Sequence, residues 1–305
     1  MKYVNLGGKL SASQISLGCM RMSGHSEKEV DDIIFTALEK GINHFDHADI
    51  YGGGDSERAF GAFLKRHPEQ RSNMIIQTKC GIRPGMYDFS YEHIMEAVNG
   101  SLSRLGLDRV DLLLLHRPDT LMEPEEVARA FDELYSSGKV GMFGVSNHNP
   151  MQIELLKTAV TQPLVANQLQ LSVTESGMFT SGMNVNMKNS ESVMHDGSVL
   201  EYSRINKMTI QAWSPFLYGF FSGLYVGNTE KFPGLNAGLT KLAEKYGISE
   251  NAVVAAWITR HPAGIQLISG TMNPAHLLDV CAGTDVTISR SDWYELYRAA
   301  GHCLP

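Results

Sequence analysis

Four residues of the chain, Asp46, Tyr51, Lys79 and His116, have the types needed for acid catalysis. A tyrosine can donate a proton, but its ordinary pKa of about 10 is high for an efficient acid at neutral pH. A neighbouring lysine cation lowers that pKa, and an aspartate keeps the lysine charged and oriented. A nearby histidine can donate a hydrogen bond to a substrate oxygen on which negative charge develops. The set predicts acid catalysis on a carbonyl group, with a cofactor supplying the hydride because no side chain can do so.

Each of these residues also has a purely structural explanation. His116 could be a core histidine, Lys79 a solvated loop lysine and Asp46 a helix cap. Their shared placement favours chemistry, because polar or ionisable residues stand at the end of nearly every predicted strand. In a parallel barrel those strand ends meet at the catalytic face. The residues at the strand ends are Gly18, Asp46, Lys79, His116, Ser146, Asn147, Asn167, Gln168, Trp213, Ser214, Ser269, Gly270 and Thr271.

No metal site is predicted among these residues. Metal-dependent barrel hydrolases usually carry an H-x-H pair on the first strand, and the first strand here has no histidine. His44, Asp46 and His47 do not form that arrangement. Strand alternation also places His47 on the opposite side from Asp46.

The elements that must position these residues alternate between strand and helix. A β-hairpin is predicted over residues 1–17, around Gly7 and Gly8, leading into a first strand that ends at Gly18. Further strands are predicted over 42–45, 74–78, 110–115, 140–145, 164–167, 209–212 and 265–268. Helices are predicted from a capping box at Ser26 to Gly41, from Asp55 onward, and over 90–105, 124–137, 150–159, 199–206, 238–261 (two pieces), 274–282 and 290–301.

Strict alternation implies a parallel sheet, and eight such units in 305 residues favour a closed (β/α)8 TIM barrel with an N-terminal β-hairpin and extra C-terminal helices. No G-x-G-x-x-G follows the first strand, which argues against a Rossmann domain. No low-complexity linker interrupts the chain, so residues 1–305 are expected to form one domain. Residues 171–198 and 217–235 are expected to be helix-free loops over the active face.

Composition limits the partners. The chain is 43% hydrophobic and 19% charged, with a net charge of -7 and no run of five like charges. Nucleic acid and anionic membrane surfaces would require a basic stripe, so neither is expected as a partner. The N-terminus lacks the apolar segment of a signal peptide. The cysteines, Cys19, Cys80, Cys281 and Cys303, are scattered, which fits free thiols in a reducing cytoplasm.

Five sequence blocks then resemble a known family. FDHADIYG, the QTK of the third strand, LLLLHRPD, GKVGMFGVSN and AWSPF, in this order, look like the signature blocks of an aldo-keto reductase. The resemblance extends from about Tyr3 to the C-terminus. It implies nicotinamide-dependent reduction of a small-molecule carbonyl compound by the tetrad Asp46, Tyr51, Lys79 and His116.

The resemblance also implies where the cofactor binds. Ser146, Asn147 and Gln168 would hold the carboxamide, and Trp213 would stack on the nicotinamide ring. Ser214, Pro215 and Phe216, with Ser222, Gly223 and Leu224, would follow the pyrophosphate. Gly270, Thr271, Met272, His276 and Asp279 fall on the segment for the 2′-phosphate and adenine, and Gly18, Met20 and Arg21 are also assigned to the cofactor.

NADP is the expected cofactor, with NAD as the alternative. Many members carry basic residues in the 2′-phosphate segment, where this chain has Gly270 and His276. A neutral histidine offers a phosphate much less than a guanidinium group does. Another alternative is a nicotinamide-binding regulatory subunit with little turnover, as in the related subunits of potassium channels. The sequence leaves the carbonyl substrate, the direction of the reaction and the oligomeric state open.

Overall fold

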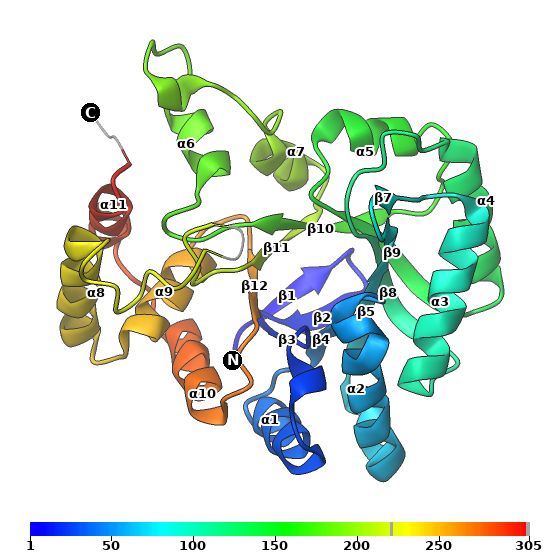
Figure 1. Ribbon diagram of the computed structural model, residues 1–305. Coiled ribbons are helices and arrows are strands. Elements are labelled where there is room, and N and C mark those ends of the chain that lie inside the picture. The colour runs from blue at the N-terminus through cyan, green and yellow to red at the C-terminus, as the bar shows by residue number, and fades with distance from the viewer. Residues whose placement is uncertain (220–221, 303–305) are drawn as a thin grey trace.

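The structure is a computed structural model that describes residues 1–219 and 222–302 (Figure 1). Within these residues, eight parallel strands close into a barrel in the order β10-β11-β12-β3-β4-β5-β8-β9. Their bounds are β3 Ile15–Gly18, β4 His44–Asp46, β5 Ile75–Cys80, β8 Val110–Leu115, β9 Val140–Ser146, β10 Leu164–Gln170, β11 Thr209–Trp213 and β12 Gln266–Ser269. The predicted TIM barrel is confirmed.

The N-terminal hairpin covers one end of this barrel. Strands β1 (Tyr3–Leu6) and β2 (Leu10–Ser13) pair antiparallel, as the sequence predicts. Leu6 of β1 belongs to the same buried apolar cluster as Leu112 and Leu114 of β8. Leu113 belongs instead to the larger cluster between barrel and helices, so β8 is apolar because both of its faces are covered. The amino ends of the strands therefore close over an apolar floor, and the polar strand ends face the other way.

Helices surround the barrel (Figure 1). Their bounds are α1 Glu27–Glu39, α2 Asp55–Arg66, α3 Tyr91–Leu105, α4 Pro124–Ser136, α5 Pro150–Leu156, α6 Gly177–Met183, α7 Val199–Ile205, α8 Pro233–Tyr246, α9 Glu250–Thr259, α10 Pro274–Ala282 and α11 Arg290–Ala299. The capping box at Ser26 is present, with reciprocal hydrogen bonds between Ser26 and Glu29. Short 3-10 turns lie at Met22–Gly24, Tyr51–Gly54, Pro68–Asn73, Ser190–Ser192 and Gly283–Asp285.

The prediction of two helix-free loops is wrong. Residues 171–198 contain α6 and the turn Ser190–Ser192, and α8 begins at Pro233, inside the second stretch and five residues before the predicted start. Helix α6 is held by tertiary contacts, because the ring of Phe179 lies 5.8 Å from Trp257 and 5.7 Å from Trp293. A seven-residue segment without helical periodicity gives no local signal of such packing. The sequence also did not reveal the small hairpin of β6 (Ile82–Arg83) and β7 (Met86–Tyr87).

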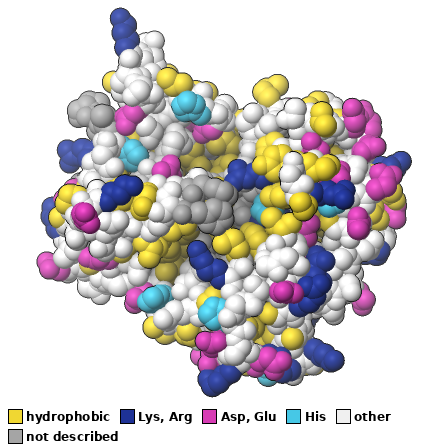
Figure 2. All heavy atoms as spheres, viewed as in Figure 1, with side chains coloured by type: hydrophobic (Ala, Val, Ile, Leu, Met, Phe, Trp, Pro, Cys, Tyr) yellow, Lys and Arg dark blue, Asp and Glu magenta, His cyan; other side chains and the backbone are white. Residues whose placement is uncertain are grey.

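The thiols and the surface can be compared with the expectations from composition. Cys19, Cys80 and Cys281 are buried and free, whereas Cys303 lies outside the described residues. Figure 2 shows basic and acidic side chains interspersed over the face in view. Among the described residues, no helix combines the length and apolar character needed to cross a bilayer.

Candidate active site

The predicted tetrad comes together at the carboxyl end of the barrel. Asp46 at the end of β4 pairs in register with Gln77 of β5, and Lys79 follows two residues later on the same face. The Lys79 ammonium Nζ lies 2.8 Å from Asp46 Oδ1 and 2.9 Å from Oδ2. It also donates to the Tyr51 hydroxyl at 3.0 Å and to the His47 carbonyl oxygen at 2.8 Å. Lys79 and Asp46 are buried, so their ion pair is shielded from water, whereas Tyr51 is half-buried.

The glycines after Tyr51 shape the turn that presents it. Gly52, Gly53 and Gly54 have φ angles of 58°, 64° and 92°. At Gly52 an added Cβ would lie 2.5 Å from Ser23 Oγ, so only glycine fits there. The three glycines thus form the tight turn that leads into α2.

The ion pair keeps both partners charged. Burial alone would raise the pKa of Asp46, but attraction to Lys79 and hydrogen bonds from Lys79 and Gln168 hold it below its ordinary value. Burial would likewise lower the pKa of Lys79, and the opposing pull of Asp46 and Tyr51 raises it instead. The lowered pKa of Asp46 and the raised pKa of Lys79 both indicate a carboxylate facing an ammonium.

The Lys79 cation lowers the pKa of Tyr51, as the residue types predict, but the net pKa is nevertheless raised. Burial is the largest influence and raises the pKa, outweighing the attraction of the Lys79 cation. The sequence could not show how deeply the phenol lies. Tyr51 is therefore a protonated phenol at neutral pH, hydrogen-bonded to a cation that would stabilise the phenolate once the proton leaves.

His116 completes the tetrad from the residue after β8. Its ring centroid lies 5.9 Å from that of Tyr51, in an edge-to-face arrangement. Burial, and then repulsion by Lys79, lowers its pKa to about 3. The ring is therefore neutral at physiological pH, and its Nδ1 has no hydrogen-bond partner among the described residues.

The residues predicted to hold the carboxamide also lie together. Asn147 Nδ2 donates to Ser146 Oγ at 2.8 Å, and Asn147 Oδ1 accepts from Trp213 Nε1 at 3.1 Å. Ser146 Oγ donates to the Gln168 carbonyl oxygen at 3.0 Å. Asn147 and Ser214 have φ angles of 59° and 52°, a conformation uncommon for residues other than glycine. Such outliers at strand ends are typical of functional sites.

The predicted pyrophosphate segments face each other. Leu217 and Leu224 form an isolated antiparallel bridge, and Tyr225 N donates to Phe216 O at 3.2 Å. Tyr225 is fully buried and its hydroxyl donates to Pro215 O at 2.8 Å. This pairing places residues 214–216 beside residues 222–224 at the end of β11.

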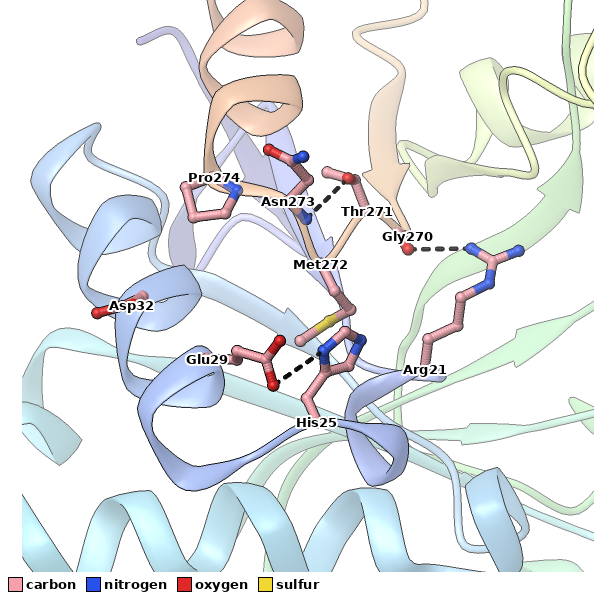
Figure 3. Close-up of a pocket in the computed structure, with 9 residues that line it drawn as sticks. All are labelled: Arg21, His25, Glu29, Asp32, Gly270, Thr271, Met272, Asn273 and Pro274. Atoms are coloured by element: carbon pink, nitrogen blue, oxygen red, sulfur yellow. Dashed lines mark hydrogen bonds and ion pairs between the residues drawn. The ribbon is translucent and has the colours of Figure 1, made fainter.

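The predicted 2′-phosphate segment lines a cavity of about 550 Å³ beyond β12 (Figure 3). Gly270, Thr271 and Met272 line it, with Asn273 and Pro274 at the start of α10. Arg21 reaches across and donates to Gly270 O at 3.0 Å. His276 and Asp279 are not among the lining residues, whereas His25, Glu29 and Asp32 of the facing segment are.

The cavity can accept a nucleotide, because it is open and its wall carries the Arg21 guanidinium and the His25 ring. Arg21 is the only arginine or lysine among the nine lining residues. The His25 Nδ1 lies 3.7 Å from Glu29 Oε2, so a carboxylate partly neutralises that side of the cavity (Figure 3). The donor set fits an adenosine group with one strong contact to a phosphate.

The described residues contain no group of three His, Cys, Asp or Glu side chains that could hold a metal ion. His47 was predicted to point to the opposite side of its strand from Asp46, and this is confirmed. Its ring packs against Phe60 of α2, away from the tetrad, with the ring centroids 4.5 Å apart.

A buried glutamine at position 77, in contact with Asp46, is a residue of this site that the sequence did not indicate. Its position two residues before Lys79, on the same strand face, was the available signal.

Comparison with known proteins agrees with this arrangement. The family model for the aldo/keto reductase family matches residues 14–300. A 6-dehydroglucose reductase of Agrobacterium fabrum is 36% identical, over 98% of both chains. The uncharacterized oxidoreductase YcsN of Bacillus subtilis is 33% identical, over the full length of both. An aldo-keto reductase of Klebsiella pneumoniae, solved in complex with NADPH, shares the fold with a TM-score of 0.77 at 20% identity, over 97% of this chain and 94% of that one.

A barrel with this constellation at its carboxyl end is the architecture of a nicotinamide-dependent oxidoreductase. The chain belongs to the aldo/keto reductase family.

Proposed function

We propose that this protein reduces an aldehyde or ketone to an alcohol, with NADPH as the hydride donor. The observation that carries the proposal is the Lys79 ammonium, which is fully buried and contacts both the Asp46 carboxylate and the Tyr51 hydroxyl. An ammonium in that position stabilises the phenolate that remains when Tyr51 gives its proton to a substrate oxygen.

Each side chain has a distinct part in the reaction. A nicotinamide held at this site would supply the hydride for the carbonyl carbon. Tyr51 donates its hydroxyl proton to the carbonyl oxygen, and Lys79 stabilises the phenolate with Asp46 holding it in place. His116, neutral because of its low pKa, offers a ring N–H to the same oxygen as negative charge develops there.

The residues brought together at the strand ends would hold the cofactor. Both hydrogens of the Gln168 amide are used, by Asp46 Oδ1 and Gln211 Oε1, so its Oε1 is the atom that would accept from the carboxamide. Ser146 and Asn147 would bind the same group, and Trp213 would cover the ring. Residues 214–216 and 222–224 would follow the pyrophosphate, and Arg21 with Gly270, Thr271 and Met272 would enclose the adenosine end; His276 and Asp279 stay assigned there, and Gly18 and Met20 stay assigned to the cofactor.

We further propose that residues 1–305 work as one domain in the cytoplasm, to which the buried free thiols are suited. Nucleic acid and membrane surfaces are not proposed as partners. Relatives named as voltage-gated potassium channel subunits are 26–28% identical, below the 33–36% of four relatives named as reductases or oxidoreductases, while a further relative named as a reductase is 26% identical. The regulatory alternative is therefore less supported, and binding of nicotinamide without turnover on any carbonyl compound would restore it.

The test measures NADPH oxidation at 340 nm over a panel of carbonyl compounds. The panel includes a sugar oxidised to an aldehyde at C6, because two relatives are named 6-dehydroglucose reductase. Tyr51→Phe is the matched variant, since it removes one hydroxyl from the same ring. Near-full turnover by this variant, with normal cofactor binding, would overturn the proposal.

A further inference from the structure

Four buried glutamines form a continuous hydrogen-bonded chain inside the barrel, next to the ion pair. Gln77, Gln211 and Gln266 are fully buried, and Gln168 is 3% exposed. They come from β5, β11, β12 and β10, and they lie at matched register positions. Gln77 pairs with Asp46, and Gln211 pairs with both Gln168 and Gln266. A barrel interior is ordinarily filled by branched apolar side chains, so this arrangement requires an explanation.

The glutamine chain begins at Asp46 and ends at the backbone of the hairpin. Gln77 and Gln168 each donate from Nε2 to Asp46 Oδ1. Gln77 and Gln211 form a reciprocal amide pair, at 3.0 and 2.9 Å. Gln211 Nε2 donates onward to Gln266 Oε1 at 2.8 Å, and Gln266 Nε2 donates to the Ser13 carbonyl oxygen at 2.7 Å.

The hydrogen-bond acceptors at the two ends of the glutamine chain fix the orientation of every amide in it. The carboxylate of Asp46 and the carbonyl of Ser13 can only accept hydrogen bonds, so the Nε2 groups of Gln77 and Gln266 must face them. The Gln77 Oε1 then accepts from Gln211, whose second hydrogen goes to Gln266. A proton on Asp46 Oδ1 would face the two amide donors of Gln77 and Gln168, and a proton on Oδ2 would face the Lys79 ammonium. The glutamine chain and Lys79 together therefore match the anionic form of Asp46.

We propose that Gln77 is a positioning residue for the proposed reduction, and that its amide holds Asp46 anionic and in place so that Asp46 keeps Lys79 against Tyr51. The inference rests on the proposed function, because it assigns Gln77 a role in the same reaction. Gln77 acts through Asp46 and does not touch the substrate.

Gln77 is the member of the glutamine chain best placed for this role. Gln168 also donates to Asp46, but it is one of the residues proposed to bind the carboxamide. Gln77 is fully buried, and Gln211 holds its amide from across the barrel through two hydrogen bonds. The outward face of the same strand is equally fixed, since Thr78 Oγ1 donates to Glu57 of α2 at 2.6 Å. The amide of Gln77 is thus held in position independently of any ligand.

The first experiment is a double-mutant cycle between positions 46 and 77. Gln77→Met keeps the shape of the side chain and removes the amide, and we expect kcat to fall about tenfold or more with the Kd for NADPH unchanged. In an Asp46→Asn background there is no anion left to hold, so the same substitution should change kcat by less than about threefold. Gln14→Met is the matched control, because Gln14 is also buried but donates to the Thr259 and Ile265 carbonyls.

A second variant covers the case in which Gln77→Met does not fold. Gln77→Glu keeps the length of the side chain and, when protonated, can still donate one hydrogen bond to Asp46. Two carboxyl groups in contact cannot both ionise easily, so the introduced carboxyl group would lose its proton only as the pH rises. The ratio of the kcat of Gln77→Glu to that of the wild type is therefore expected to fall between pH 5.5 and pH 8.5.

The results separate the inference from the proposed function. An active wild type, an inactive Tyr51→Phe variant and a Gln77→Met loss that disappears in the Asp46→Asn background support both. A Gln77→Met variant with wild-type kcat, an equal loss in both backgrounds, or a Gln77→Glu ratio that does not vary with pH overturns the positioning role alone. A wild type without turnover on the panel overturns the proposed function instead.

Discussion

Removing the ammonium at the centre of the site should destabilise the protein in a pH-dependent way. Lys79→Met keeps most of the buried chain volume but leaves the Asp46 carboxylate buried without a cation. Breaking a buried ion pair by removing one partner costs about 3–5 kcal/mol. At about 2.1 cal/mol/K of unfolding entropy per residue over 305 residues, this corresponds to a fall in Tm of about 5–8 °C.

The sign of the pH dependence follows from the pKa of Asp46. In the wild type Lys79 outweighs burial and holds this pKa below the ordinary 3.8. Without Lys79 the effect of burial is opposed only by hydrogen bonds such as that from Gln168, and the folded-state pKa rises above 3.8. A raised carboxyl pKa gives stability that is present below the unfolded value and is lost as the pH rises through the folded value. The variant should therefore be nearest to the wild type at about pH 4 and furthest from it near pH 8.

Urea unfolding at pH 4.5, 6 and 8, followed by tryptophan fluorescence, measures this difference. The matched control is the double variant Asp46→Asn/Lys79→Met, which removes both charges and should recover more than about half of the lost stability. A loss below about 1 kcal/mol, or a loss that is the same at every pH, would refute the account of Lys79 as the partner of a buried carboxylate.

Three further outcomes are expected. Tyr51→Phe should lower kcat by about 10²-fold or more with an unchanged Kd for NADPH, because the substitution removes the proton donor and no cofactor contact. Stopped-flow single turnovers measure the rate of the chemical step, and a loss seen only in product release would contradict this role of Tyr51. Since the pKa of His116 is lowered to about 3, kcat should show no step from this residue between pH 5 and 8; a step with a midpoint near 6.5 that disappears in His116→Gln would contradict a neutral ring. Arg21→Met should weaken NADPH binding about tenfold and NADH binding less than about twofold, as measured by fluorescence titration; equal losses would show that Arg21 does not contact the 2′-phosphate.

The barrel and the tetrad could be predicted because their signals are local. Apolar runs, helix caps and glycine stops mark each unit, and the strand-end rule then selects Asp46, Lys79 and His116. The limits of the elements were less certain: the strand predicted over 164–167 extends to Gln170 in β10, and the one predicted over 74–78 extends to Cys80 in β5. In both cases the added residues include polar side chains, Gln168 and Lys79, which are typical of loops when met in a sequence.

The missed features depend on contacts between distant parts of the chain. Helix α6 exists because Phe179 meets two tryptophans of α9 and α11. The raised pKa of Tyr51 depends on burial depth, and its balance against the Lys79 charge cannot be judged from residue types. The Gln77–Gln211 pair joins strands 134 positions apart, so no spacing within either strand predicts it.

The apolar cluster at the amino end of the barrel and the glutamine chain above it have complementary effects on the Asp46–Lys79 ion pair. Leu6 of the hairpin, with Leu112 and Leu114, excludes water from the amino end of the barrel. A carboxylate and an ammonium interact more strongly where water is excluded, but each is then costly to leave unpaired. Gln77 and Gln168 stabilise the buried Asp46 carboxylate by donating hydrogen bonds to Oδ1. The Tyr51 hydroxyl and the His47 carbonyl oxygen stabilise the buried Lys79 ammonium by accepting hydrogen bonds from it. Tyr51 therefore faces a cation whose position is fixed before any substrate binds, which is the preorganisation that proton transfer to a carbonyl oxygen requires.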